Sequence, residues 1–201
     1  MTSTRIIIPH RGLEAAKTRL ASSLSPEERI MLVSQLLQRV LKVTHEMCDD
    51  VVVISPSRAL AEIVEPSGAR LVVQRGMGLN EGLEQARFDA LVEDVGTLII
   101  LHGDLPNLQA GDVSVLAAAL PDGDAPAVAI APDRAGTGTN GLALRPPGVI
   151  RFRFGLGSFA AHLEEVQLAG VPLVAVNRAG IAFDLDTPED LTRWFELGDA
   201  A

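Results

Sequence analysis

The sequence predicts an α/β fold with three layers, in which helices cover both faces of a doubly wound, mostly parallel sheet. Two observations predict it. Short runs rich in Val, Ile and Leu alternate with longer amphipathic segments, and these runs are apolar at nearly every position rather than at every second one. Strands that are apolar on both faces belong to a sheet covered on both sides. Alternating strands and helices with short connections imply right-handed crossovers between parallel strands.

Six segments are predicted strands, because each is a continuous aliphatic run bounded by turn residues: Arg5–Ile8, Val51–Ile54, Arg70–Val73, Thr97–Leu101, Ala127–Ala131 and Val171–Val176. Helices are predicted from Ser25-Pro26 onward, over Glu81–Glu93 behind Asn80, over Ala110–Leu120, over Phe159–Ala169, and from Thr187-Pro188 to near Gly198. The first helix has the clearest start, since serine at N-cap, proline at N1 and glutamate at N3 mark a helix N-terminus.

Length and composition predict one domain over residues 1–201, because 201 residues with 47% apolar side chains can bury a sizeable core. The segment 132–158 interrupts the alternation with many glycines and prolines. It predicts an insertion of loops and short strands beside the strand ends. Such an insertion is a plausible wall for an acceptor substrate, because loops at strand ends often carry binding residues.

The charge and the single cysteine exclude several classes of function. A net charge of −9 disfavours non-specific binding to nucleic acid or membranes, which needs an excess of lysine and arginine. No apolar run approaches the roughly 20 residues of a bilayer span, and no leader is recognised. Cys48 is the only cysteine, so an internal disulfide and a multi-cysteine metal site are excluded. We therefore expect a cytoplasmic protein with neither nucleic acid nor membrane as partner.

Three aspartates at two well-separated predicted strand ends carry most of the functional information. Asp104 closes the apolar run that begins at Thr97, and Asp184 and Asp186 lie far downstream in F-D-L-D-T-P-E-D-L. On an extended chain Asp184 and Asp186 face the same side. Carboxylates beside the ligand crevice of an α/β sheet can hold a divalent cation against a phosphate. The alternatives are a turn or capping role for Asp104, and an arginine partner or a helix-capping role for Asp186.

The loop after the first predicted strand is basic. It holds Arg11, Lys17 and Arg19, and it lacks both the G-x-G-x-x-G and the Walker patterns, which weakens dinucleotide binding and P-loop hydrolysis. Three cations in one loop suit a triphosphate held by side chains and backbone N–H groups. The alternative is that Arg11 and Arg19 are solvated and that Lys17 lies along a helix surface.

Six motifs together make the chain resemble one family from Ile6 to Leu191. They are P-H-R-x5-K-T-R-L at 9–20, G-L-N-E-G-L at 78–83, G-D-L-P at 103–106, D-R-A-G-T-G-T-N at 133–140, F-G-x-G-S-F-x-x-H at 154–162 and D-L-D-T-P-E-D-L at 184–191. In this order they resemble the CofC/FbiD family of phospho-carboxylate guanylyltransferases. The resemblance implies a GT-A-like nucleotidyltransferase fold, which is Rossmann-like and agrees with the predicted sheet.

The resemblance also implies an activity: transfer of GMP from GTP to the phosphate of a small acid, with Mg²⁺ and release of pyrophosphate, in coenzyme F420 biosynthesis. The acceptor would be 2-phospho-L-lactate, phosphoenolpyruvate or 3-phosphoglycerate. A homodimer would fit the family. The implied sites are Lys17, Arg11 and Arg19 for the triphosphate and catalysis, Asn80 and Asp104 along the nucleotide, Asp104, Asp184 and Asp186 for magnesium, and Thr139, Gly155, Ser158 and His162 for the acceptor.

The sequence departs from the family pattern in the first loop. Arg11 stands where lysine is usual, and His10 replaces a commonly apolar residue. The roles of His10 and His102 stay open, although a packed role for His102 is favoured. Two other functions also stay open: a nucleotidyltransferase for a pterin or sugar phosphate on the same fold, and a GTP-binding regulatory protein without turnover.

Overall fold

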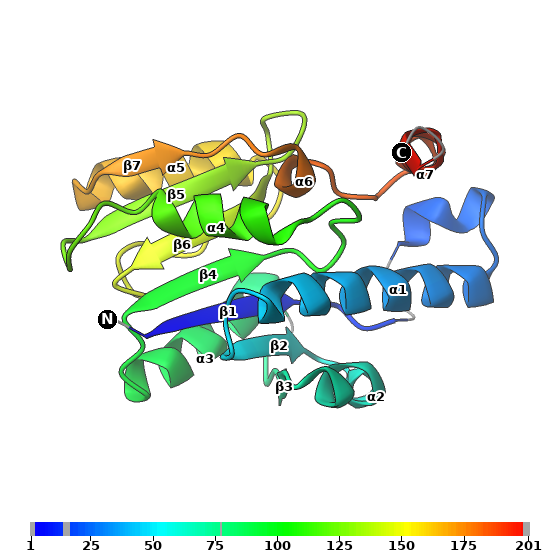
Figure 1. Ribbon diagram of the computed structural model, residues 1–201, viewed down its shortest axis with the longest axis horizontal. Helices are drawn as coiled ribbons and strands as arrows, with labels where there is room; N and C mark the ends of the chain where they lie inside the picture. The colour runs from blue at the N-terminus through cyan, green and yellow to red at the C-terminus, as the bar shows by residue number, and fades with distance from the viewer. Residues whose placement is uncertain (1–2, 14–16, 77, 199–201) are drawn as a thin grey trace.

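The computed structural model describes residues 3–13, 17–76 and 78–198. Its centre is a seven-stranded sheet with the order β3-β2-β1-β4-β6-β5-β7 (Figure 1). The strands are β1 (Thr4–Pro9), β2 (Val51–Ser55), β3 (Arg70–Val73), β4 (Thr97–Leu101), β5 (Ala127–Pro132), β6 (Thr139–Arg145) and β7 (Leu173–Ala175). Among the strands of the described residues, β6 alone runs antiparallel to its neighbours, β4 and β5, and the other pairs are parallel. The predicted doubly wound, mostly parallel sheet is confirmed.

The antiparallel strand β6 lies inside the segment 132–158, where loops and short strands were predicted. All seven of its residues are buried at the centre of the sheet. Gly141 explains why the strand was hard to predict. A Cβ atom there would lie 3.0 Å from Leu116 and 3.2 Å from both Ala131 and Ile181, so the close packing favours glycine. The rest of the segment forms the loops on either side of β6.

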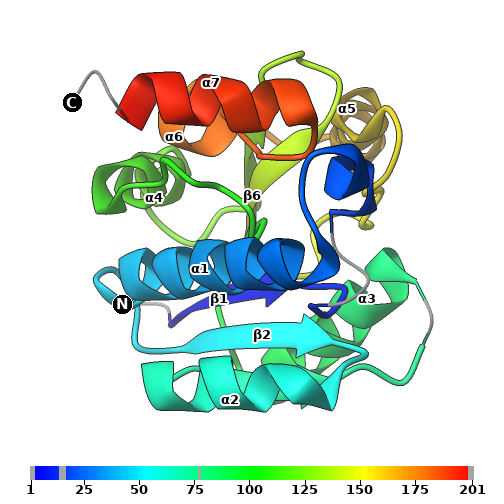
Figure 2. The ribbon, with the colours of Figure 1, turned by 90° about the vertical axis from the view of Figure 1, so that its right-hand side faces the viewer.

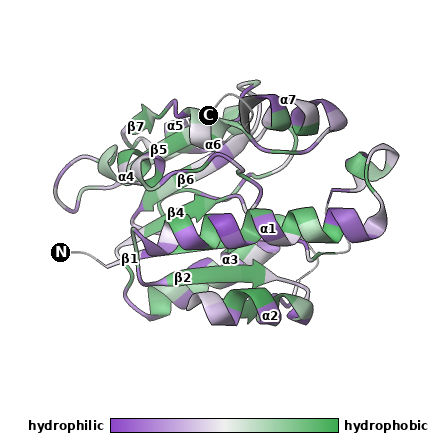
Figure 3. Ribbon diagram, turned by 45° about the vertical axis from the view of Figure 1, so that its right-hand side comes forward, coloured by the Kyte–Doolittle hydropathy of each residue, from purple (hydrophilic) through white to green (hydrophobic). Residues whose placement is uncertain are grey.

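Helices cover both faces of the sheet, as Figures 1 and 2 show. The apolar cluster on one face contains residues of α1 (Pro26–His45), α2 (Ala61–Val64), α4 (Ala110–Ala118) and α6 (Ala179–Ala182). The cluster on the other face contains residues of α3 (Leu79–Val92) and α5 (Ser158–Ala169). Strand β1 supplies both clusters, because Ile6 and Ile8 face the first while Ile7 faces the second. This is why the strands are apolar throughout (Figure 3).

The predicted helices are present, with one correction at the start of α3. Ser25 and Glu28 form the predicted capping box of α1, with bonds of 3.2 and 2.8 Å. Gly78, however, is the N-cap of α3, so Asn80 lies in the first turn of the helix rather than before it. The last helix, α7, covers Pro188–Gly198. In the described ranges no helix is both long and apolar enough to cross a bilayer.

A third apolar cluster brings the two ends of the described chain together. Leu20, in the 3-10 helix η1 (Thr18–Ser22), packs with Leu32 and Leu36 of α1 and with Leu185 and Leu191 near and in α7. Figures 1 and 2 show α7 beside η1. This packing places the basic loop after β1 next to the segment that contains Asp184 and Asp186.

Candidate functional site

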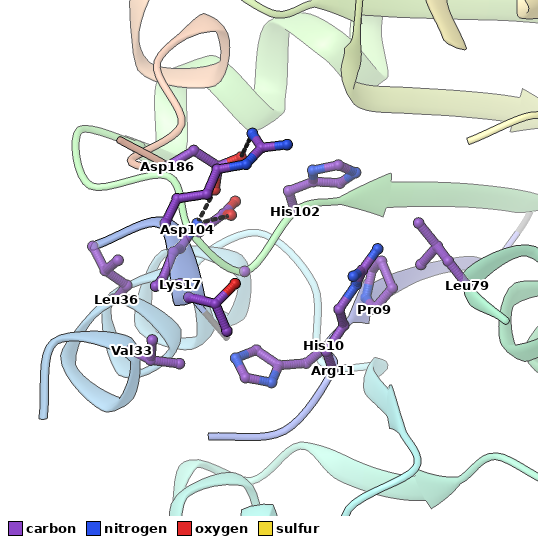
Figure 4. Close-up of a pocket in the computed structure, with 13 residues that line it drawn as sticks. Pro9, His10, Arg11, Lys17, Val33, Leu36, Leu79, His102, Asp104 and Asp186 are labelled. Atoms are coloured by element: carbon purple, nitrogen blue, oxygen red, sulfur yellow. Dashed lines mark hydrogen bonds and ion pairs between the residues drawn. The ribbon is translucent and has the colours of Figure 1, made fainter. Parts of the chain in front are cut away.

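A cavity of about 400 Å³ opens at the carboxyl ends of β1 and β4. From β1 the sheet continues to β2 on one side and to β4 on the other, which is the position where doubly wound sheets bind ligands. The residues that line the cavity are Pro9, His10, Arg11, Lys17, Thr18, Arg19, Val33, Leu36, Leu79, His102, Gly103, Asp104 and Asp186 (Figure 4). Five of the predicted site residues therefore share one cavity.

Lys17 occupies the centre of the charged group. Its backbone is left-handed, with φ 56°, and its side chain is only 6% exposed. The ammonium donates to Asp104 Oδ2 and, at 2.5 Å, to Asp186 Oδ1. Burial opposes the charged form of Lys17, but the two carboxylates outweigh burial and raise its pKa. Lys17 is therefore a fixed cation, and the alternative of a lysine lying along a helix surface is wrong.

Asp104 follows β4 and has one satisfied and one unsatisfied oxygen. Burial favours the neutral form, yet the nearby Lys17 ammonium lowers the pKa of Asp104 below its ordinary value. Its Oδ1 atom is buried and has no hydrogen-bond partner among the described residues. An unpaired buried oxygen on an ionised carboxylate costs free energy, so this atom is suited to a cationic ligand.

Asp184 and Asp186 lie in the loop between α6 and α7, and not at a strand end as the sequence suggested. Leu185 between them is fully buried, and its N–H donates to the carbonyl oxygen of Asp104 at 3.2 Å. Asp184 accepts a 3.1 Å bond from Asn140, while Asp186 faces Lys17. Burial, and after it the charge of Asp104, raises the pKa of Asp184. The three carboxylates are thus close enough to repel one another.

The described residues contain no group of three His, Cys, Asp or Glu side chains placed to hold a metal ion. Figure 4 shows the Lys17 ammonium paired with both Asp104 and Asp186. The chemistry of the donors still suits Mg²⁺, because this ion commonly takes one or two carboxylates and completes its shell with water and substrate phosphates. The unpaired Oδ1 of Asp104 favours a cation here, and a cation would also offset the negative charge of Asp104 and Asp186 that Asp184 faces.

Arg11 and Arg19 also line the cavity but remain open to solvent. The Arg19 side chain is 75% exposed and lies 3.9 Å from Asp186, a distance at which an exposed pair contributes little to stability. Arg11 forms no hydrogen bond or ion pair with any residue that the structure describes. Both guanidinium groups are therefore available to an anion. Residues 14–16 of this loop lie outside the described residues.

The four predicted acceptor residues gather around the N-terminus of α5, outside the lining of the cavity. Ser158 is the first residue of α5 and donates its N–H to Gly155 at 3.1 Å. Thr139 begins β6 and is joined to α5 through His162, one turn after Ser158, at 3.1 Å. The dipole of a 12-residue helix favours an anionic ligand near its N-terminus, although the N–H groups of Ser158 and Phe159 already donate to the carbonyl oxygens of Gly155 and Thr137.

His162 is buried, and both of its ring nitrogens are engaged within the protein. It is 0% exposed, and its Nε2 atom accepts the N–H of Arg153 at 3.0 Å. In the neutral ring Nδ1 therefore carries the proton and donates to the Thr139 hydroxyl, which leaves that hydroxyl's own proton free. The predicted direct contact between His162 and the acceptor does not fit this geometry.

Acid is expected to destabilise the protein through His162. Burial lowers its pKa to about 4 from 6.5, so the unfolded chain binds a proton that the folded protein excludes. The stabilisation is complete above pH 6.5 and is lost as the pH falls toward 4, by about 3 kcal/mol at 1.36 kcal/mol per unit. In His162→Asn, which keeps a donor toward Thr139, the free energy of unfolding should fall less steeply over this range than in the wild type. Urea titrations at several pH values measure it, and equal slopes would contradict the assignment.

Asn80 has a structural role that the sequence did not indicate. Its amide nitrogen donates to the carbonyl oxygen of Phe154 at 2.9 Å, and its carbonyl oxygen accepts the N–H of Phe154 at 2.9 Å. Both polar atoms are thus engaged in holding the segment that leads to Gly155 and Ser158. The predicted position along the nucleotide does not agree with these bonds.

Replacing Asn80 by alanine should loosen the acceptor side and leave the nucleotide side unchanged. Two hydrogen bonds are lost, each contributing about 1 kcal/mol, and the N–H of Phe154 is left unpaired. We expect the acceptor KM to rise about tenfold while the KM for GTP changes less than twofold. Steady-state kinetics with each substrate varied in turn test this, and an equal rise of both values would return Asn80 to the nucleotide side.

Two further residues that sequence reasoning missed hold the acidic loop. Asn140 donates to the backbone oxygen of Ile181 at 3.0 Å as well as to Asp184. Asp190 accepts the N–H groups of Asp186 and Thr187 at 3.2 and 3.0 Å. The T-P-E-D sequence was a signal for Asp190, because a carboxylate three residues after threonine completes a capping box. No comparable signal marked Asn140.

The comparisons with known proteins identify the family of the chain. Residues 4–200 match the family described as guanylyl transferase CofC like. The chain belongs to this family. The resemblance seen in the sequence is therefore confirmed, and the protein is a nucleotidyltransferase of the CofC-like family.

Relatives of the CofC-like chain carry two substrate names. It is 42% identical over 94% of its length to a phosphoenolpyruvate guanylyltransferase of Sphaerobacter thermophilus, of which it covers 91%. It is 32% identical over 97% of its length to a 2-phospho-L-lactate guanylyltransferase of Methanocaldococcus infernus, of which it covers 86%.

Solved structures agree with the fold of the CofC-like chain. A CMP:2-keto-3-deoxy-manno-octonic acid synthetase complexed with CTP superposes with a TM-score of 0.65 at 16% identity, over 99% of both chains. A 4-diphosphocytidyl-2C-methyl-D-erythritol synthase gives 0.66 at 16% identity, over 99% of this chain and 100% of the other. At this identity the likeness shows the fold alone, and it confirms the expected GT-A-like nucleotidyltransferase class.

Proposed function

We propose that the protein transfers GMP from GTP to the phosphate of phosphoenolpyruvate, with release of pyrophosphate, and that the product enters coenzyme F420 biosynthesis. The observation that carries the reaction class is the buried Lys17 fixed between Asp104 and Asp186 in a cavity with two open guanidinium groups. Phosphoenolpyruvate is favoured over 2-phospho-L-lactate because the relative at 42% identity bears that name, whereas the 2-phospho-L-lactate relatives have 32 to 35%.

The reaction needs alignment and charge neutralisation more than proton transfer. An oxygen of the acceptor phosphate attacks the α-phosphorus of GTP, and the bond from that phosphorus to the oxygen bridging the α- and β-phosphates breaks. The electron pair leaves with pyrophosphate. Because the attacking oxygen is already anionic, no base is required. Lys17, Arg11 and Arg19 would neutralise the negative charge that gathers on the triphosphate in the transition state.

Magnesium is part of this proposal. Asp104 would hold it through the unpaired Oδ1, together with Asp184 and Asp186. The bound ion would supply charge stabilisation at the phosphates. Thr139, Gly155 and Ser158 would bind the acceptor, since the N-terminus of α5 suits its carboxylate or phosphate. Asn140 joins the two regions, because it follows Thr139 in β6 and bonds to Asp184.

Pyrophosphate release by the purified protein tests the proposal. The reaction is run with GTP and Mg²⁺ and with phosphoenolpyruvate, 2-phospho-L-lactate or 3-phosphoglycerate, and is repeated with ATP and CTP. We expect turnover with GTP and phosphoenolpyruvate, and loss of it when EDTA removes the metal. Faster turnover with 2-phospho-L-lactate would correct the acceptor. GTP binding with no pyrophosphate from any acceptor would favour a regulatory protein instead.

A further inference from the structure

His10 lines the nucleotide cavity, yet the proposed chemistry gives it no role. It directly follows β1, and its backbone N–H donates to the carbonyl oxygen of Ile54 at 2.9 Å, which continues the pairing of β1 with β2 by one residue. The side chain is partly buried and is one of the residues that surround the cavity (Figure 4). The pairing of β1 with β2 therefore fixes the backbone position from which the His10 side chain extends.

The tautomer of His10 follows from a single backbone contact. The N–H of Gly12 lies 3.0 Å from His10 Nδ1. A backbone N–H can only donate, so Nδ1 must accept, and the proton of the neutral ring is on Nε2. Burial lowers the pKa of His10 to about 4, which keeps the ring neutral at pH 7. Gly12 has φ 99°, and a Cβ atom there would lie 2.9 Å from Ser57 Cβ, so the turn that presents this N–H requires glycine.

The Nε2–H group is the free end of the ring. It forms no hydrogen bond with the residues that the structure describes. It is also absent from the buried side-chain atoms that lack a partner, which in the described chain are His45 Nε2, His102 Nε2 and Asp104 Oδ1. This atom is therefore not fully buried, and the side chain that carries it lines the cavity. His10 thus offers an oriented, neutral donor beside Lys17 and Arg11.

We propose that His10 Nε2–H donates a hydrogen bond to a phosphate oxygen of the bound nucleotide, so that His10 is a nucleotide-binding residue of this protein. The inference rests on the proposed function, because it takes the cavity to be the GTP site. A phosphate oxygen is the acceptor that fits, since three cationic side chains line the same cavity and would gather the triphosphate there. The cationic side chains attract the anion, and the hydrogen bond from the neutral His10 ring would orient its phosphate group.

Two amide variants separate ligand binding from loop support. In His10→Asn the carbonyl oxygen takes the place of Nδ1, so the bond from Gly12 can persist, but no donor reaches the position of Nε2. In His10→Gln the amide nitrogen takes the place of Nε2 and keeps the ligand donor, while the acceptor for Gly12 is lost. Affinities are measured by titration calorimetry with Mg²⁺ and without acceptor, using GTP, inorganic pyrophosphate and guanosine. Thermal unfolding checks that both variants are folded.

We expect His10→Asn to bind GTP and pyrophosphate about tenfold more weakly, as one hydrogen bond to a charged group predicts, and guanosine as the wild type does. His10→Gln should remain within about threefold of the wild type for all three ligands. The reverse order of the two variants would show that His10 only supports Gly12, and unchanged affinity in both would also overturn the proposal. A loss in His10→Asn that is equal for guanosine would overturn the phosphate assignment. Failure of the proposed function can be distinguished from failure of the His10 proposal. It would appear as a wild-type protein that binds GTP but releases no pyrophosphate with any acceptor.

Discussion

Replacing Asp104 by asparagine is expected to lower kcat by about 10³-fold while leaving the protein folded. The side chains have the same shape, but the variant lacks the charge that balances Lys17 and that would bind the metal through Oδ1. A loss of about 4 kcal/mol of transition-state stabilisation corresponds to this factor, and metal and electrostatic contributions are of that size. The measurement is pyrophosphate release at saturating GTP and acceptor.

Asp50→Asn is the matched control for Asp104→Asn. Asp50 accepts a 2.8 Å bond from Arg5 just before β2, at the amino ends of the strands, and does not line the nucleotide cavity. The same chemical change at this position should cost some stability through the lost ion pair and leave kcat unchanged. If Asp104→Asn retained more than a tenth of wild-type turnover, or if Asp50→Asn lost as much, the role given to Asp104 would be wrong.

Replacing Lys17 by methionine should lower kcat by about 10²–10³-fold and also destabilise the fold. The ammonium stabilises two carboxylates that otherwise repel each other. A fully buried pair broken in this way costs about 3–5 kcal/mol, and because Asp186 is 42% exposed we expect roughly 2 kcal/mol. The wild-type contribution of Lys17 is present at neutral pH and is lost only as the pH rises through its raised pKa.

Lys42→Met provides the control, because Lys42 is the only other lysine and lies exposed on α1. Urea unfolding and pyrophosphate release are compared for the two variants. Without Lys17 the pKa of Asp104 should rise, so the acid limb of the rate profile should move to higher pH. A Lys17→Met variant as active as Lys42→Met would show that the open arginines suffice for the triphosphate.

The strands were predictable because the sheet is covered on both faces. Continuous aliphatic runs such as Thr97–Leu101 are required when successive side chains must pack against helices on opposite sides. Strand β6 was not predicted individually because it contains Gly141, which the close packing at its centre favours, and glycine in a short polar and aliphatic run is typical of a loop. The predicted start of α3 was wrong because the N-cap is Gly78. Asn80, two residues later, is a more typical N-cap residue and was therefore placed before the helix.

The site was predictable as residue types but not as geometry. The carboxylates at 104, 184 and 186 and the cations at 11, 17 and 19 were identified from local motifs. That Lys17 lies between two of the carboxylates depends on a left-handed backbone at a non-glycine residue and on packing among distant segments. The engagement of Asn80 and His162 within the protein likewise depends on contacts with Phe154 and Arg153, which no local pattern encodes.

The apolar cluster that joins η1 to α7 has a consequence for synthesis of the chain. Lys17 and Asp186, which it brings together, are separated by 169 positions. During translation the basic loop leaves the ribosome long before its acidic partners exist, so a nascent chain cannot acquire the paired cation until the loop that contains Asp186 has been made. The sheet strands β1 to β4 can associate earlier, whereas the charged centre assembles last. The enzyme is therefore expected to become competent only after Asp186 has left the ribosome, and a shorter translation product that lacks the acidic loop would have no paired cation at this site.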